Sequence, residues 1–222
     1  MKSIYPPDIF LSPNLAIERM NQLVQKYGKS NAFTEGRFKE EREAAITAVF
    51  LLGYRLLLKR DFWIGVCQDD PPDNIAVSPQ KRASGRGMEK HIINIEIFEW
   101  EGHSARGLPQ AIRDKLKAKN YPQDYFLLCQ VRRPGEMANL EECYQDLNRE
   151  KPGVSEVWLV SSIEDNQFDH VIVCLYPSRA EIPFTLSEQL DATKNQPPCL
   201  RELGRGIMDH PEPTDDTHLP LP

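Results

Sequence analysis

Two short apolar segments carry the residues best suited to metal chemistry. Residues 71–77 read Pro-Pro-Asp-Asn-Ile-Ala-Val and place Asp73 directly before a predicted strand, and residues 92–100 place Glu96 inside the next strand. Two carboxylates on neighbouring strands suit Mg²⁺ or Mn²⁺, because such ions take a few carboxylate ligands and keep water molecules for a substrate. The spacing therefore predicts a metal site formed by Asp73 and Glu96.

Each carboxylate also has an ordinary structural interpretation. Pro-Pro-Asp-Asn is favourable turn chemistry, so Asp73 could belong to a simple turn. Glu96 lies between Ile95 and Ile97, where a buried carboxylate is costly unless it is paired or bound to a metal. On an edge strand its side chain would instead meet water. The sequence leaves both alternatives open.

A long helix predicted from about residue 36 to 59 offers a third carboxylate. At about 100° per residue, Glu41 falls inside the apolar stripe of this helix, whereas Glu40 and Glu43 fall outside it. Glu41 is therefore a candidate third metal ligand. The alternative is a first-turn glutamate that is favoured by the helix dipole.

The helix predicted over residues 108–119 directs a lysine toward the sheet. Lys115 projects into the apolar arc of this helix, which consists of Leu108, Ala111, Ile112 and Leu116. A lysine that faces a sheet needs a partner, and the pair of Asp73 and Glu96 could supply one. Alternatively, its stem packs against the sheet and its amine reaches water.

Hydrophobic periodicity and turn signals predict how the chain is organised. We expect an N-terminal helical extension at 1–35, a core at 36–133, an α/β extension of the same domain at 134–207 and a disordered tail at 208–222. The core order is helix, three strands, helix, strand. Sequential strands predict an antiparallel part and the crossover helix predicts a parallel strand, which together indicate an α/β (α+β) fold with a mixed central sheet flanked by helices.

This order, with Asp73 after two prolines and Glu96 in mid-strand, resembles the PD-(D/E)xK, or restriction-endonuclease-like, superfamily. The resemblance implies metal-dependent hydrolysis of phosphodiester bonds, with Asp73 and Glu96 as metal ligands and Glu41 as the helix acid of many members. That family places a lysine two residues after the glutamate, where this chain has Phe98. Lys115 resembles lysines that have migrated to the following helix in some members.

The charge distribution bears on partners. The chain of 222 residues has a net charge of -6, yet residues 81–133 contain eleven Lys and Arg against six Asp and Glu. A locally basic surface is compatible with binding of a nucleic-acid phosphate backbone, and we expect DNA rather than RNA. A surface whose charges are simply solvated explains the pattern equally well. The candidate nucleic-acid contacts are Lys81, Arg82, Arg86, Arg132 and Arg133.

Two function classes follow from these features. The first is a Mg²⁺-dependent endonuclease in a bacterial DNA-processing or defence system. The second is a catalytically inactive nuclease fold that acts as an interaction or assembly subunit, with protein partners or as a homodimer. The five cysteines form no CxxC pair and no apolar run approaches the ~18 residues of a membrane span, so we expect a cytoplasmic protein without a membrane segment.

Overall fold

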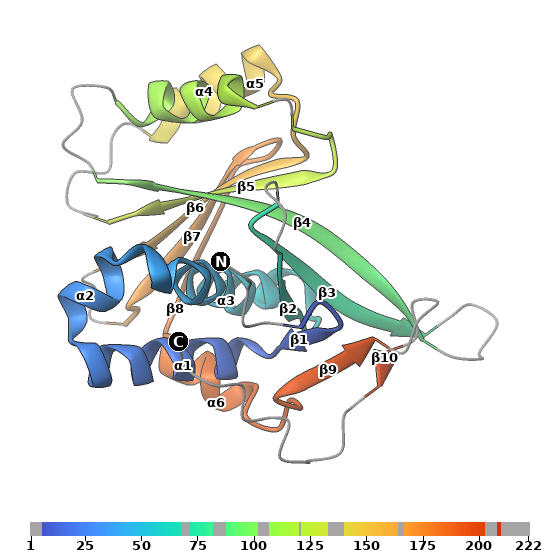
Figure 1. The fold of residues 1–222 in the computed structure, drawn as a ribbon. Helices are drawn as coiled ribbons and strands as arrows, with labels where there is room; N and C mark the ends of the chain where they lie inside the picture. Colours follow the sequence, from blue (N-terminus) through green and yellow to red (C-terminus); the bar gives the residue numbers. More distant parts are fainter. Residues whose placement is uncertain are drawn as a thin grey trace. The chain divides into compact units, whose positions relative to one another are not determined.

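The computed structural model describes residues 6–67, 72–81, 88–101, 107–119, 121–132, 140–163, 167–202 and 208–209. The chain divides into two compact units, one formed by Met1–Ile93 with Leu190–Pro222 and the other by Asn94–Gln189. These boundaries do not coincide with those expected at residues 36 and 134. Strand β4 (Met88–Trp100) begins in the first unit and ends in the second (Figure 1).

The first unit contains an antiparallel sheet that joins distant parts of the sequence. Its strand order is β10-β9-β1-β2-β3, and neighbouring strands in this series pair antiparallel. The bounds are β1 (Ile9–Leu11), β2 (Trp63–Val66), β3 (Asn74–Lys81), β9 (Cys199–Glu202) and β10 (Met208–Asp209). Strand β10 opens the segment expected to be a disordered tail, whereas residues 210–222 lie outside the described residues.

The helices of the first unit include two long ones that pack on each other. Their bounds are α1 (Pro13–Tyr27), α2 (Lys29–Thr34), the 3₁₀ turn η1 (Gly36–Phe38) and α3 (Lys39–Leu58). Ser12 caps α1 by accepting a hydrogen bond from the Leu15 amide at 3.2 Å, and Gly28 ends the helix with a φ of 82°. Helix α3 contacts α1, β2 and β3, so it is buried on several sides and holds the start of β3 in place.

The second unit contains a mixed sheet. Its strand order is β4-β5-β6-β7-β8, in which β4–β5 and β5–β6 are parallel and β6–β7 and β7–β8 are antiparallel. The strands are β5 (Tyr125–Val131), β6 (Glu156–Ser162), β7 (His170–Tyr176) and β8 (Ala180–Phe184), and the helices are α4 (Leu108–Ala118), α5 (Leu140–Glu150) and α6 (Leu186–Ala192), which crosses the second boundary.

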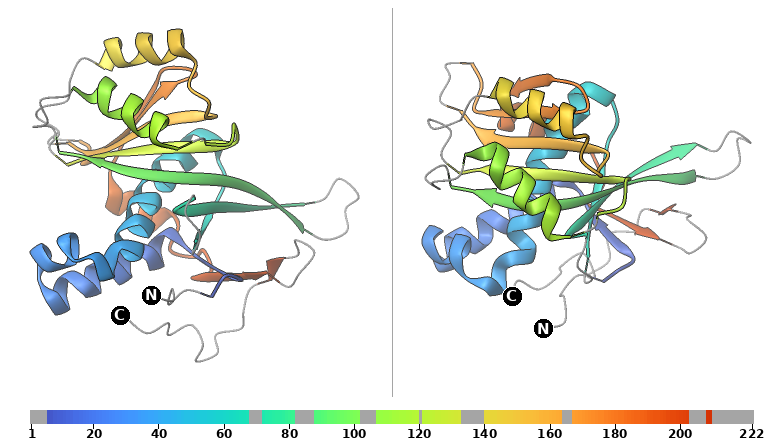
Figure 2. Two further views of the ribbon diagram at one scale, coloured as in Figure 1. Left: turned by 45° about the horizontal axis from the view of Figure 1, so that its top comes forward. Right: turned by 90° about the horizontal axis from the view of Figure 1, so that it is seen from above.

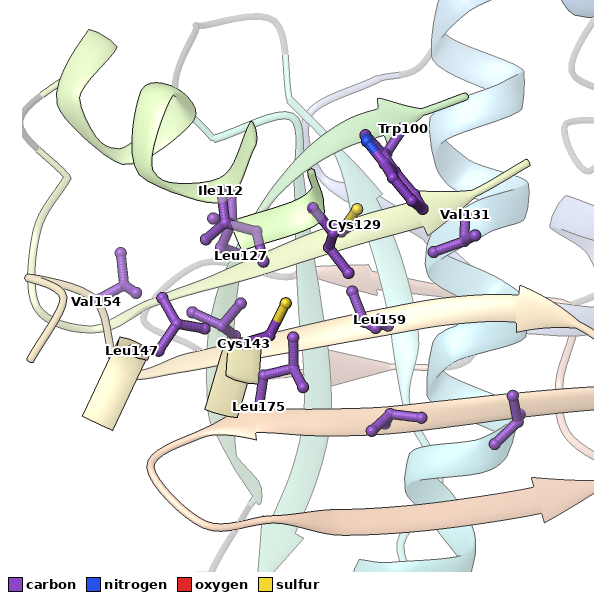
Figure 3. Close-up of a cluster of buried hydrophobic side chains, with 14 of the residues drawn as sticks. Trp100, Ile112, Leu127, Cys129, Val131, Cys143, Leu147, Val154, Leu159 and Leu175 are labelled. Atoms are coloured by element: carbon purple, nitrogen blue, oxygen red, sulfur yellow. The ribbon is translucent and has the colours of Figure 1, made fainter. Parts of the chain in front are cut away.

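Helices α4 and α5 cover one face of this sheet, side by side (Figure 2). Leu108 and Ile112 of α4 and Cys143 and Leu147 of α5 are buried among side chains of β5, β6 and β7, as Figure 3 shows for most of them. Apolar residues at helical spacing therefore meet every second residue of the strands, which is the geometry expected for a helix packed on a sheet.

The predicted fold class is confirmed. The protein is of the α/β class, with a mixed sheet flanked by helices, and residues 36–133 follow the expected order of helix, three strands, helix, strand. No helix in the described part of the chain has the length and apolarity that a membrane crossing requires.

Candidate functional site

Glu96 lies in the interior of the second unit. On β4 the side chains alternate, so Glu96 shares a face with Phe98 and Trp100, while Ile95 and Ile97 occupy the opposite face. The strand is paired in parallel with β5, where Glu96 stands opposite Leu127. Only 1% of Glu96 is exposed, so the alternative in which its side chain faces water is wrong.

Three donors converge on one oxygen of this carboxylate. Lys115 Nζ lies 2.8 Å from Glu96 Oε1, Lys119 Nζ lies 3.2 Å from it, and the Tyr121 hydroxyl donates to it at 3.2 Å. Burial of a carboxylate is unfavourable, but hydrogen bonds from charged donors compensate for lost hydration. The sequence predicted that Lys115 faces the sheet, and the structure brings its ammonium group to Glu96.

Helix α4 positions the two lysines through its apolar face. Leu108 and Ile112 on that face are completely buried, and Lys115 follows Ile112 at a spacing of three residues, which keeps it on the same side. Lys119 is the residue after the last turn and has an extended backbone. The chain leaves the helix after Ala118 and returns Tyr121 toward β4. Neither Lys119 nor Tyr121 was predicted as a site residue, although the spacing of four residues from Lys115 was a signal for Lys119.

The other carboxylate oxygen is the atom best suited to a metal ion. Among the residues that the structure describes, Glu96 Oε2 is buried and has no hydrogen-bond partner. A buried acceptor without a donor is costly, and a bound cation is one way to satisfy it. This oxygen could supply one ligand to a hard divalent cation such as Mg²⁺ or Mn²⁺, and a metal at Glu96 stays a prediction.

Asp73 lies in the first unit at the start of β3. Its carbonyl accepts a hydrogen bond from the Cys67 amide at 3.1 Å, and the neighbouring Asn74 donates to Thr47 of α3 at 3.1 Å. These bonds join the residue after β2 to the start of β3 and tie β3 to α3. The Asp73 carboxylate, with its side chain 6% exposed, lies 3.5 Å from Lys39 Nζ.

Helix α3 contributes a second carboxylate to this group, and it is Glu43. Lys39 Nζ lies 3.3 Å from Glu43 Oε1 as well as close to Asp73. Burial and the charge of Asp73 raise the pKa of Glu43 to about 7, while Lys39 opposes the shift. Although burial lowers the pKa of Lys39, the charges of Glu43 and Asp73 outweigh it and raise that pKa above its ordinary value.

Glu41, the predicted helix ligand, is buried in a different setting. Its exposed fraction is 2%, and neither of its carboxylate oxygens has a hydrogen-bond partner within the described ranges. Burial raises its pKa, and its charged neighbours are Arg19, Glu40 and Arg42. A role for Glu41 at a metal stays a prediction.

Asp73 belongs to the first unit and Glu96 to the second, so a metal shared by the two carboxylates also stays a prediction. In the part of the chain that the structure describes, no group of three or more His, Cys, Asp or Glu side chains could hold a metal ion.

The predicted nucleic-acid contacts are only partly described. Arg132 lies just after β5 and forms ion pairs with Glu99 and Glu101, the latter at 3.3 Å. Lys81 is the last residue of β3. The remaining three, Arg82, Arg86 and Arg133, lie outside the described residues.

Comparison with known proteins adds no further constraint, because no protein-family model and no curated protein matches the chain.

Proposed function

We propose that this protein is a metal-dependent nuclease of the restriction-endonuclease-like type, which hydrolyses phosphodiester bonds. The observation that carries the proposal is the 2.8 Å contact between Lys115 Nζ and a Glu96 carboxylate that keeps its second oxygen without a partner in the described structure. A buried carboxylate with a lysine beside it combines a metal ligand and a cation in one small site.

Each residue has a definite role in this proposal. Glu96 Oε2 and Asp73 would hold Mg²⁺ or Mn²⁺. Glu41 would assist, or Glu43, which shares Lys39 with Asp73. The chemistry supplied by the bound ion is polarisation of the phosphate and activation of water. Lys115, held in place by Glu96, offsets negative charge on the phosphate as the bond to the leaving oxygen breaks.

The basic residues would bind the substrate backbone. Lys81, Arg82, Arg86, Arg132 and Arg133 contact phosphates in this proposal, and Arg132 exchanges its carboxylate partners for them. We infer a DNA substrate, a cytoplasmic location and a bacterial DNA-processing or defence system as the setting.

A second function is favoured by Phe98. This residue occupies the position where the family lysine is expected, and it packs against the hydrophobic core between the sheet and helices α4 and α5. An apolar side chain at that position is what a nuclease fold that has lost catalysis would carry. Such a protein would act as an assembly subunit, with a protein partner or as a homodimer.

A cleavage assay separates the two functions. Purified protein is incubated with plasmid, linear DNA and RNA in Mg²⁺ or Mn²⁺, beside Glu96→Gln, Lys115→Met and the matched control Lys117→Met, which removes an exposed charge from the same helix. The nuclease is supported by cleavage of DNA that both site variants lose and the control keeps. Absence of cleavage by the wild type with every substrate and metal would favour the assembly subunit.

A further inference from the structure

A pocket of about 220 Å³ adjoins the Glu96 site within the second unit. It is lined by Leu116, Lys119, Tyr121, Gly153 and Val154. These residues come from the last turn of α4, the segment that follows it and the segment before β6. The lining thus combines two aliphatic side chains, one aromatic ring, one ammonium group and a glycine, and most of its surface is polar.

Two of the lining side chains are held by the buried carboxylate. Lys119 and Tyr121 both bond to Glu96 Oε1 at 3.2 Å, and the Tyr121 ring also lies 6.1 Å from the Tyr125 ring. Because Glu96 itself is fixed in β4, the ammonium group and the ring are positioned before any ligand arrives. Such preorganisation lowers the entropic cost of binding.

The electrostatics at this corner favour an anion. Lys115 and Lys119 bring two positive charges to Glu96, which carries one negative charge. The C-terminal end of α4 adds only about half a negative charge, so these groups together remain positive. An ammonium group has three donors, and Lys119 can therefore bind a phosphate oxygen while it donates to Glu96.

We propose that this pocket binds one nucleotide unit, with its phosphate on Lys119 and its base against the Tyr121 ring between Leu116 and Val154. Bases stack on aromatic rings whatever their sequence, and Leu116 and Val154 line the same pocket as the Tyr121 ring. The volume lies below the roughly 300–1,000 Å³ of ordinary ligand sites, so the pocket could take no more than one nucleotide unit, part of which would remain in solvent. The inference rests on the proposed nuclease function, for which it names a substrate subsite.

The shared chemistry, a phosphate beside a base, has two sources. One is the terminal nucleotide of a nucleic-acid strand, and the other is a free mononucleotide. Methyl NMR of the full chain distinguishes them, because Leu116 and Val154 place methyl groups on the pocket walls. The titrations use thymidine 5′-monophosphate, a 5′-phosphorylated oligonucleotide, the same oligonucleotide without its phosphate, and inorganic phosphate, all in EDTA so that metal-dependent cleavage is suppressed.

We expect the mononucleotide or the phosphorylated oligonucleotide to shift the Leu116 and Val154 methyl signals. Tighter binding of the phosphorylated oligonucleotide identifies a strand end, and tighter binding of the mononucleotide identifies a free nucleotide. Lys119→Ala should weaken binding by at least about tenfold, since it removes a charged donor. Tyr121→Leu should weaken it for nucleotides but not for inorganic phosphate, whereas Lys117→Ala should leave it unchanged.

Three results would overturn the assignment of the pocket. The methyl signals could stay unchanged with both nucleotide probes, or inorganic phosphate could bind as tightly as the nucleotides. The third such result is that Lys117→Ala weakens binding as much as Lys119→Ala does. The cleavage assay is read separately. Cleavage without methyl shifts supports the nuclease function and contradicts nucleotide binding in the pocket. Methyl shifts without cleavage support nucleotide binding in the pocket and contradict the nuclease function.

Discussion

Replacing Lys115 with methionine removes the closest of three donors from a carboxylate that is only 1% exposed. Methionine retains most of the length of the stem, so the substitution changes charge and hydrogen bonding more than packing. Glu96 cannot reach water in compensation, and its negative charge is left to Lys119 and Tyr121, each at 3.2 Å.

The expected loss of stability depends on the donors to Glu96 that remain. Breaking a buried ion pair outright costs about 3–5 kcal/mol of stability. Here two donors persist, so the loss should approach that of a single hydrogen bond to a charged group, about 2 kcal/mol. Lys117→Met changes the same charge at an exposed position of the same helix and should cost less than about 0.5 kcal/mol.

Urea unfolding of the wild type and both variants measures the difference. A double-mutant cycle with Glu96→Gln sharpens it, because Lys115→Met should cost little once the carboxylate charge is gone. Equal midpoints for Lys115→Met and Lys117→Met, or the same loss with and without Glu96→Gln, would refute the ion pair as a stabilising contact.

Three other measurements test burial elsewhere in the described structure. Because the pKa of Glu43 is raised from 4.5 to about 7, the folded state keeps a proton that the unfolded chain releases, so the free energy of unfolding falls as pH rises through this window. Urea titrations at pH 5 and 8 without metal should show a loss that Glu43→Gln reduces by up to about 3 kcal/mol; an unchanged loss counts against the shift. Cys67 is the partly exposed cysteine, and burial raises the pKa of the other four thiols. A disulfide reagent should therefore react rapidly with one thiol in the folded protein, and Cys67→Ser should abolish this reaction; a second rapidly reacting thiol would contradict the burial of the other four. Gly65→Ala would bring a Cβ within 2.7 Å of Phe10 and should cost about 1–3 kcal/mol in urea, whereas Gly36→Ala, which meets nothing within 4 Å, should not; equal midpoints would contradict the close approach.

The contact between Lys115 and Glu96 could be predicted because both elements are regular. Alternation along β4 fixes the face of Glu96, and the helical period fixes the face of Lys115. Each rule needs only local sequence, and the core order brings the two elements together. Tyr121 lies beyond the end of α4, where no period applies, so its hydrogen bond to Glu96 could not be predicted in this way.

The burial of Glu43 could not be predicted from a helix with a single buried face. A single apolar stripe predicts one buried face, but α3 packs against α1, β2 and β3, so several of its faces are buried. Glu43, outside the stripe, is therefore largely enclosed, with its side chain 14% exposed. Glu41 inside the stripe is buried as expected, but beside Arg19 of α1.

Short strands at the ends of the chain were also beyond the sequence analysis. Strand β1 pairs with β9, so that Ile9 stands opposite Arg201. A strand of three residues has too little alternation to be recognised, and its stability depends on a partner far away in the sequence.

The most direct test of the proposed metal site is calorimetric titration of Mn²⁺ into the wild type, Glu96→Gln, Asp73→Asn and the control Glu101→Gln. Glu101 follows β4, and its side chain is 72% exposed, so its replacement removes the same charge without touching the site. We predict saturable binding to the wild type and to Glu101→Gln that is lost in both site variants. Binding that survives Glu96→Gln and Asp73→Asn, or a wild type that binds no Mn²⁺, would contradict a metal held by these two carboxylates.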